Sequence, residues 1–319
     1  MKRYIFLFVF LCCVYPLWSQ QLYHFNQYLF NDLILNPAVA GTNPCKTMGL
    51  DLRKQWVGFD GSPATQTVFF HGKFLKKVGL GSILYNDKAG AVSTLGTELD
   101  YAYQPVRNRD HLLSFGLGAS VLQYSMNQSD FQPETANDPS LTGASPSKVT
   151  FDMSTGVYYK NNYFLISFGA KHLLQTKLNI SNTNNNKLIR HYYFSASYNV
   201  LINNKVHFEP SVFIRSIGRP LPQTDFSAKF IFNDLYWLGL SYRFRDAAIV
   251  FAGIDLGQFT IGYGFEYSLS LLNPYTNGSH EVFLKYRFCK DNNENLFTSE
   301  IEGVKKRRRG YRSVDCPVW

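Results

Sequence analysis

The sequence predicts an all-β fold, a closed antiparallel β-barrel of about fourteen strands that crosses an outer membrane. Apolar and polar residues alternate with a period of two from about Thr47 onward, the pattern of strands that bury one face. Aromatic residues make up 16% of the chain and charged residues only 17%, as suits a large apolar surface. After Ser19 no run approaches the ~18 apolar residues of a membrane-spanning helix. Such a chain can span a membrane only as a closed barrel.

Residues 1–19 have the pattern of a secretory signal peptide. A short basic head, residues 1–4, precedes the apolar run 5–18, and Ser19 offers a small residue for cleavage. The alternative is a membrane-anchoring helix, but the apolar run is too short to span a bilayer comfortably. We therefore expect export across the inner membrane of a Gram-negative bacterium.

Residues 20–46 precede the first predicted strand. Apolar residues recur in this segment at helical spacing: Phe25, Tyr28, Leu29 and Leu33. Asn36-Pro37 would end such a helix. We expect a short amphipathic helix that either plugs the barrel lumen or lies at its periplasmic rim, and the sequence leaves both placements open.

Residues 47–288 form the predicted barrel. In the stretch 259–269, odd positions are aromatic or aliphatic and even positions are Gly, Thr, Glu or Ser. The predicted strands are about ten residues long, and Tyr and Phe crowd their ends, as in tilted transmembrane strands with aromatic girdles. Fourteen is an even number, as single-chain bacterial barrels require. The strands are expected to begin near Thr47, Thr65, Val78, Val92, His111, Val149, Tyr163, Arg190, Lys205, Asp225, Leu235, Ala247, Gln258 and His280.

The connections between the predicted strands alternate in length. With both termini in the periplasm, the short connections face the periplasm: 75–77, 161–162, 203–204, 233–234 and Gly257. The two longest connections, 125–148 and 173–189, then face outward. A soluble β-sandwich also alternates apolar and polar residues, but short periplasmic turns with long external loops are typical of membrane barrels.

Three cysteines remain after the signal peptide, which contains Cys12 and Cys13. Because a closed barrel pairs its first and last strands, Cys45 and Cys289 should lie at the same rim, near enough for a disulfide. A bridge between Cys289 and Cys316 and three free thiols are the alternatives, and the sequence does not choose among them.

Residues 289–319 form a basic tail, which we place in the periplasm. The residues that could dock there are Lys305, Lys306, Arg307, Arg308, Arg309, Tyr311 and Trp319. The tail is either a solvated basic run or a docking segment for an acidic periplasmic partner, with Tyr311 and Trp319 as apolar anchors. Nucleic acid is the usual partner of such a run, but we expect none in the periplasm.

No catalytic arrangement is evident in the sequence. It has no His-Glu-x-x-His, Gly-x-Ser-x-Gly or Cys-x-x-Cys motif and no glycine-rich phosphate loop, and its seven histidines are scattered. A barrel hydrolase would need a nucleophile paired with a histidine at the rim, and we find none. We therefore expect no enzyme activity, no cofactor and no metal site.

Four short motifs in the first third of the chain carry a family resemblance. They are Leu35-Asn36-Pro37-Ala38-Val39-Ala40-Gly41, the pattern Arg-x-Gln-Trp-x-Gly…Gly-x-Pro-x-Thr-Gln over 53–66, Gly79-Leu80-Gly81, and Asn86-Asp87-Lys88-Ala89-Gly90. In this succession the chain resembles the PorP/SprF family of Bacteroidetes, outer-membrane proteins of the type IX secretion system. The basic tail matches no motif of that family.

The resemblance implies a protein that anchors secreted cargo, of gliding or adhesin type, at the cell surface through the cargo's C-terminal sorting domain. It also implies links to other type IX secretion components and to periplasmic lipoproteins. An outer-membrane barrel is further expected to contact membrane lipid and lipopolysaccharide.

The alternative function is an outer-membrane channel or transporter for small solutes. Charged residues of both signs are expected to face the lumen: Glu98, Asp100, Glu209, Arg243, Arg245, Glu266, Lys285 and Arg287. In a plugged lumen these residues would form salt-bridged networks, whereas in an open pore they would be hydrated.

The candidate partner-binding residues lie in or beside two neighbouring loops that are expected to face outward, 57–64 and 86–90. They are Arg53, Gln55, Trp56, Gly58, Gly61, Pro63, Asn86, Asp87 and Lys88. Gly58 and Gly61 permit tight turns, Pro63 rigidifies the loop, and Trp56 anchors the strand end. These connections either form a docking surface for cargo or pack against each other over the lumen.

Overall fold

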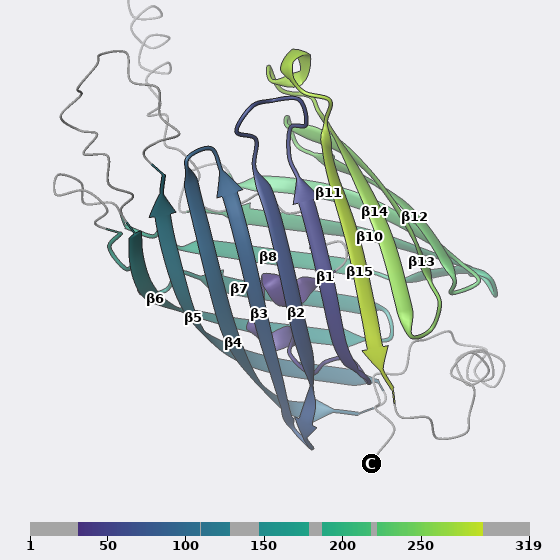
Figure 1. The fold of residues 1–319 in the computed structure, drawn as a ribbon. Coiled ribbons are helices and arrows are strands. Elements are labelled where there is room, and N and C mark those ends of the chain that lie inside the picture. Colours follow the sequence, from purple (N-terminus) through teal and green to yellow (C-terminus); the bar gives the residue numbers. More distant parts are fainter. Residues whose placement is uncertain (1–30, 109, 128–146, 179–186, 218–221, 290–319) are drawn as a thin grey trace, which may run out of the picture.

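The computed structural model describes residues 31–108, 110–127, 147–178, 187–217 and 222–289, which fold into a closed antiparallel β-barrel (Figure 1). The predicted signal peptide, residues 1–19, lies outside the described residues. So do residues 290–319 of the basic tail, with Lys305, Lys306, Arg307, Arg308, Arg309, Tyr311 and Trp319. Among the described residues, no helix is long and apolar enough to cross a membrane.

The predicted number of strands is confirmed. The described chain has fifteen strand segments, of which β8 and β9 both pair with β10 and together form one strand of the wall. The wall therefore consists of fourteen strands, and each begins within two residues of its predicted position. The segments are β1 (Lys46–Lys54), β2 (Ala64–Leu75), β3 (Val78–Ala89), β4 (Val92–Arg107), β5 (His111–Met126), β6 (Ser147–Asn161), β7 (Phe164–Lys171), β8 (His191–Tyr198), β9 (Val200–Asn203), β10 (Val206–Ser216), β11 (Gln223–Phe232), β12 (Tyr236–Arg243), β13 (Ala247–Asp255), β14 (Phe259–Ser268) and β15 (Ser279–Phe288).

The barrel closes where its first and last strands pair. β1 and β15 run antiparallel, in a register that extends from Lys46 opposite Phe288 to Lys54 opposite His280. Cys45 precedes β1 and Cys289 follows β15, and the two form a disulfide with their Cα atoms 4.8 Å apart. The covalent link therefore joins the two ends of the wall.

Polar residues face the lumen and apolar residues face outward. In β1, Asp51 and Arg53 are buried, whereas Met48 and Leu52 are exposed. The same alternation recurs in the other strands, so that an apolar belt surrounds the barrel. This arrangement is the inverse of a soluble protein and is that of a membrane barrel.

The two ends of the barrel differ, as Figure 1 shows. Connections 76–77, 162–163, 204–205 and 256–258 are short and lie at the end where β1 begins and β15 ends, which we call the short-turn end. The opposite end, which we call the long-loop end, carries the longer connections, among them 55–63 and 269–278.

Residues 31–44, which we call the plug, lie inside the lumen (Figure 1). They form two 3-10 turns, η2 (Asp32–Ile34) and η3 (Pro37–Val39). Asn31 and Asn36 interrupt the helical path, since each is extended and its side chain accepts a hydrogen bond from the turn that follows. The predicted helical positions 25–29 lie outside the described residues.

Candidate functional site

Glycines of the wall make room for the plug. A Cβ atom at Gly116 would lie 2.1 Å from the backbone nitrogen of Ala38, and one at Gly79 would lie 2.0 Å from the carbonyl oxygen of Ala40. Such distances are far below van der Waals contact, so larger residues there would have to displace the plug. These wall glycines, with Gly169 against Leu35, form a cradle shaped to the plug backbone.

Hydrogen bonds fix the plug in this cradle. Asn36 Nδ2 donates to Ser167 Oγ at 2.8 Å and to the carbonyl oxygen of Val157 at 3.0 Å. At the other end of the plug, a guanidinium nitrogen of Arg107 donates to the carbonyl oxygen of Gly41 at 2.8 Å. The plug is thus hydrogen-bonded to β4, β6 and β7, which lie close together in the wall.

The plug also supplies the centre of an apolar core inside the lumen. Its buried members pack against apolar side chains of the wall: Leu33, Ile34, Leu35, Ala38, Val39 and Ala40 from the plug, and Phe69, Ile83, Ala102, Leu112, Tyr158, Tyr193, Phe213 and Phe283 from the strands. A cavity of about 40 Å3 lies between the plug and the wall, and Glu98 and Lys171 are among its lining residues. It has room for only a few water molecules.

One plug residue carries a perturbed carboxyl group. Burial, together with the nearby Glu209 carboxylate, raises the pKa of Asp32 from 3.8 to about 6. Nearby lysines on the wall, Lys229 among them, oppose this shift in the pKa but do not cancel it. The lumen therefore disfavours a negative charge at this position.

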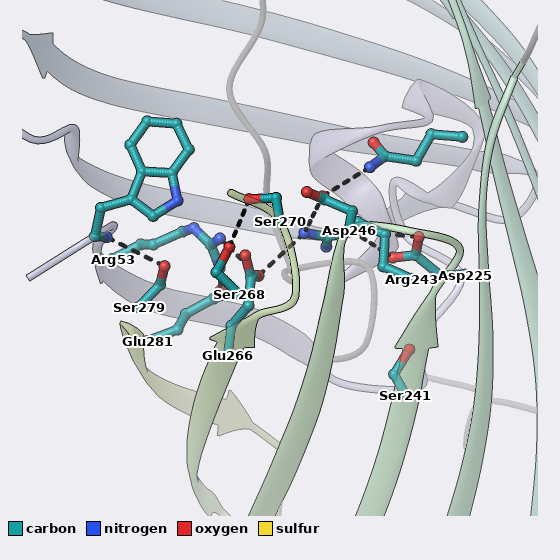
Figure 2. A network of polar contacts seen from close by, with 12 residues as sticks. Arg53, Asp225, Ser241, Arg243, Asp246, Glu266, Ser268, Ser270, Ser279 and Glu281 are labelled. Carbon is teal, nitrogen blue, oxygen red and sulfur yellow. Dashed lines mark hydrogen bonds and ion pairs between the residues drawn. The ribbon is translucent and has the colours of Figure 1, made fainter. Parts of the chain in front are cut away.

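A buried ionic network lies in the lumen near the long-loop end of the barrel (Figure 2). Arg53 donates to Glu281 at 2.7 Å and to Glu266 at 3.0 Å, and Arg243 donates to Glu266 at 3.1 Å and to Asp225 at 3.2 Å. Each of these side chains is at most 6% exposed. The network joins β1 to strands of the other end of the chain, β11, β12, β14 and β15.

Most of the predicted lumen residues are ion-paired. Glu98 pairs with Lys171 at 2.6 Å, Glu209 pairs with Lys229 at 2.9 Å, and Arg287 pairs with Asp255. The ammonium group of Lys285 lies 5.8 Å from the centre of the Phe283 ring, and Asp100 is buried against the lumen. The prediction for Arg245 was wrong, because this residue is exposed in the turn between β12 and β13. The arrangement is that expected of a plugged lumen.

The loop 55–63 packs between two other connections at the long-loop end. The Val57 N–H donates to the carbonyl oxygen of Gly278 at 2.8 Å, and the Asn277 N–H returns a bond to Val57 at 2.7 Å. On the other side the Gly90 N–H donates to the carbonyl oxygen of Gly61 at 2.8 Å. Gly58 and Gly61 both adopt positive φ, as their predicted turns require.

The candidate partner-binding residues divide into buried and exposed groups. Arg53, Gln55 and Asp87 are buried toward the lumen, where Asp87 accepts a short hydrogen bond from Thr65. Trp56 and Pro63 are half-buried. The exposed members are Gly58, Gly61, Asn86 and Lys88, so any direct contact with a partner falls to these.

The prediction that residues 86–90 form an outward loop was wrong. Asn86, Asp87 and Lys88 belong to β3 and pair with Gln66, Thr65 and Ala64 of β2. Only Gly90 and Ala91 form the turn to β4. Their pairing with β2 holds these residues in the wall.

An exposed apolar surface at the long-loop end was not anticipated. Leu271 is 95% exposed, Tyr275 is 70% exposed and Phe59 is 50% exposed. We call these three residues, with Leu272, the apolar crest. They lie on the loops 55–63 and 269–278, which are joined by the hydrogen bonds at Val57. The available signal was the absence of Asp, Glu, Lys and Arg from residues 267–278.

Comparison with known proteins gives one family and one architecture. The family model described as type IX secretion system membrane protein PorP/SprF matches residues 18–286. The barrel is similar to the Ralstonia pickettii toluene transporter TbuX, with TM-score 0.51 and 9% identity over 81% of this chain and 93% of that one. It is also similar to the P. putida toluene transporter TodX, with TM-score 0.50 and 9% identity over 82% and 94%. No curated protein matches the sequence.

Proposed function

The chain belongs to the PorP/SprF family of type IX secretion system membrane proteins, and we propose that it anchors a secreted cargo protein at the cell surface. The observation that carries this proposal is the apolar crest, which exposes Leu271 and Tyr275 on loops that are themselves tied to the barrel. Exposed apolar side chains that cluster on an ordered surface mark sites of protein association. This role requires neither a catalytic step nor a cofactor.

The orientation of the barrel follows from its connections. In bacterial barrels the short turns face the periplasm and the longer loops face the outside. We therefore assign the short-turn end, with the Cys45–Cys289 disulfide, to the periplasm. The apolar crest then faces the outside of the cell, where a cargo protein arrives after secretion.

The filled lumen supports anchoring over passage through the barrel. The plug occupies the cradle, the apolar core surrounds it, and the charged groups above it are paired with one another. A rigid barrel of this kind offers a fixed platform for the crest. We propose that the cargo's C-terminal sorting domain docks on Leu271, Tyr275 and Phe59.

We also propose that the barrel is linked to other proteins on its periplasmic side. Other type IX secretion components and periplasmic lipoproteins are the proposed partners there, and the basic tail is the proposed contact. Cargo of gliding or adhesin type fits a surface-exposed crest. The crest and the tail would then hold one cargo between the cell surface and the periplasmic machinery.

A channel for small solutes is the second candidate function. It is favoured by the architectural similarity to the toluene transporters TbuX and TodX. The plug opposes it, because solute passage would require the plug to leave its cradle. Single-channel recording in planar bilayers separates the two candidates: steady currents through the unaltered barrel favour the channel, and their absence favours the anchor.

The anchor proposal is tested by affinity purification from native outer membranes, with a tag inserted within the connection 128–146. The test variant carries Phe59→Ser, Leu271→Ser and Tyr275→Ser. The control carries Ile202→Ser and Leu256→Ser, which also remove exposed apolar side chains, but at the short-turn end.

We expect the unaltered protein and the control to recover a large secreted protein with a C-terminal sorting domain, together with periplasmic lipoproteins. The crest variant should recover the lipoproteins and lose the secreted protein. Equal recovery of the secreted protein by the crest variant and the control would remove the crest from the proposal. Recovery of the barrel alone in every case would reject anchoring.

A further inference from the structure

Lysines and aromatic residues gather on the outer wall at the short-turn end, where β1, β2 and β15 meet. The Lys46 side chain is exposed, and its ammonium nitrogen lies 5.0 Å from the centre of the Phe74 ring. Phe74 in turn meets Phe70 edge-on, with ring centres 6.5 Å apart. On its other side Lys46 pairs with Phe288 of β15. Lys46 therefore lies among aromatic rings on the apolar outer face.

A glycine of the neighbouring strand makes room for this lysine. A Cβ atom at Gly72 would lie 2.6 Å from Cγ of Lys46 and 3.3 Å from its Cα. The aliphatic part of the Lys46 side chain therefore lies directly over Gly72 on the outer face, where any larger residue would push it aside. Gly72 thereby lets the stem reach the Phe74 ring, which gives the charge a defined position.

Two further lysines follow Phe74 closely in the sequence. Lys76 and Lys77 form the turn that follows β2, and both are exposed. Phe74 and Leu75, at the end of β2, are also exposed, and Leu75 is 66% accessible. Within the described ranges no acidic side chain forms an ion pair with Lys46, Lys76 or Lys77. We call the three lysines, together with Phe74 and Leu75, the lysine platform.

The platform lies at the level of an aromatic girdle. Tyr103 is opposite Val78, the residue that follows the 76–77 turn, and Phe115 is opposite Tyr103 on the next strand. Both aromatic side chains are exposed on the outer face. Aromatic girdles mark the boundary between lipid chains and headgroups, and lysines at that boundary extend their ammonium groups to the headgroups.

We propose that the lysine platform binds the phosphate of a phospholipid headgroup in the adjoining membrane leaflet. Lys46, Lys76 and Lys77 supply the positive charge, while Phe74 and Leu75 contact the upper part of the acyl chains. The outward direction of Lys46 favours lipid over an acidic protein, because lipid is what surrounds the outer face of a membrane barrel. The site is independent of cargo anchoring, since it lies at the opposite end of the barrel.

Native mass spectrometry of the purified full-length protein tests this site, with phosphatidylglycerol as the probe and phosphatidylcholine as the zwitterionic comparison. The test variant carries Lys46→Gln, Lys76→Gln and Lys77→Gln. The control carries Lys88→Gln, Lys148→Gln and Lys205→Gln, which remove the same charge from exposed positions elsewhere. Heat-modifiable mobility on gels verifies that each barrel is folded.

We expect the unaltered protein and the control to retain phosphatidylglycerol in preference to phosphatidylcholine. Each lysine removed from the platform should weaken retention about fivefold at low salt. Gly72→Val should weaken it too, although it keeps all three charges, because it displaces the Lys46 stem.

Three outcomes would overturn the proposal. The first is equal retention of phosphatidylglycerol by the folded test variant and the unaltered protein. The second is an equal loss in the control, which would reduce the effect to net charge. The third uses polyglutamate as a model of an acidic protein. If the test variant loses binding of polyglutamate but still retains phosphatidylglycerol, the platform binds an acidic protein and not lipid. If the triple variant does not fold, the test uses Lys46→Gln alone together with the lipid preference of the unaltered protein. If the unaltered protein does not prefer phosphatidylglycerol over phosphatidylcholine, the site is rejected.

Discussion

Arg53 and Arg243 donate hydrogen bonds to the same oxygen atom of Glu266, at 3.0 and 3.1 Å. The two arginines stand on β1 and β12, and Glu266 stands between them on β14. Two guanidinium groups around one carboxylate are tolerable because Glu281 and Asp225 neutralise their outer sides. The shared oxygen therefore ties the first strand of the barrel to β12 and β14, close to the loops that bear the apolar crest.

Glu266→Gln should destabilise the barrel strongly. The substitution keeps the shape of the side chain but leaves two buried guanidinium groups with one carboxylate fewer. Loss of one partner from a buried ion pair costs about 3–5 kcal/mol, because the remaining charge stays desolvated. Thermal unfolding of the barrel in detergent, followed by circular dichroism, should show a clear drop in the midpoint.

Glu209→Gln is the matched control for this prediction. Glu209 pairs with Lys229, but both side chains are about a fifth exposed, so water partly replaces the lost partner. Its effect on the free energy of unfolding should be under about 1 kcal/mol. If the two variants lose similar amounts of unfolding free energy, the Arg53–Glu266–Arg243 network stabilises the barrel no more than the partly exposed Glu209–Lys229 pair does.

The alternating pattern predicted the wall well because each residue's environment is set locally. A residue such as Ile261 faces lipid and its neighbour Thr260 faces the lumen, whatever the remaining chain does. The placement of the plug could not be predicted, because the spacing of apolar residues does not show whether a segment lies in the lumen or at the rim. The hydrogen-bonding side chains of Asn31 and Asn36 form two short turns that fit the lumen.

The candidate site was harder to predict because its contacts are long-range. The partners of Arg53, Glu266 and Glu281, are 213 and 228 residues away in the sequence. In the same way, Asp87 is held in the wall by Thr65 of the preceding strand. The crest residue Leu271 was overlooked, since a single exposed leucine has no motif. Burial can be assigned to such residues only when the pairing of the strands is known.

Gly116→Val should displace the plug and open the lumen. The Cβ atom of valine would lie where the backbone of Ala38 now lies, and the plug has no side chain at that point to move away. With the plug displaced, the polar lumen would fill with water. Single-channel recording in planar bilayers should then show conductance that the unaltered barrel lacks.

Ala119→Val is the control for the plug prediction. It enlarges a residue of the same strand by two methyl groups, but Ala119 is exposed on the outer face. The control should remain closed. A closed Gly116→Val barrel whose thermal stability is unchanged would show that the plug does not require a glycine at position 116.

Cys45→Ser should lower the stability of the closed barrel. The disulfide joins residues 244 positions apart in the sequence, so it restricts the unfolded chain strongly. Loss of a link of this kind costs about 2–5 kcal/mol, and a reductant should produce the same drop in the unaltered protein. Urea unfolding in detergent, with and without dithiothreitol, measures both effects. Cys316→Ser is the control, and a drop of similar size in that variant would point to a different pairing.

Asp32→Asn should change how the stability of the barrel depends on pH. The pKa of Asp32 is about 6 in the folded protein and 3.8 in the unfolded chain, so the folded state binds the proton more tightly. The contribution of Asp32 protonation to the stability of the folded state is therefore fully present below pH 3.8 and is lost as the pH rises through 6. Asparagine mimics the protonated acid at every pH, so the variant should match the unaltered protein at pH 3.5 and exceed it at pH 8 by about 1–3 kcal/mol. Asp60→Asn, at an exposed loop position, is the control: the free energy of unfolding should differ between pH 3.5 and pH 8 by as much as it does in the unaltered protein. A lower stability of Asp32→Asn at pH 8 would instead mean that the plug needs the negative charge.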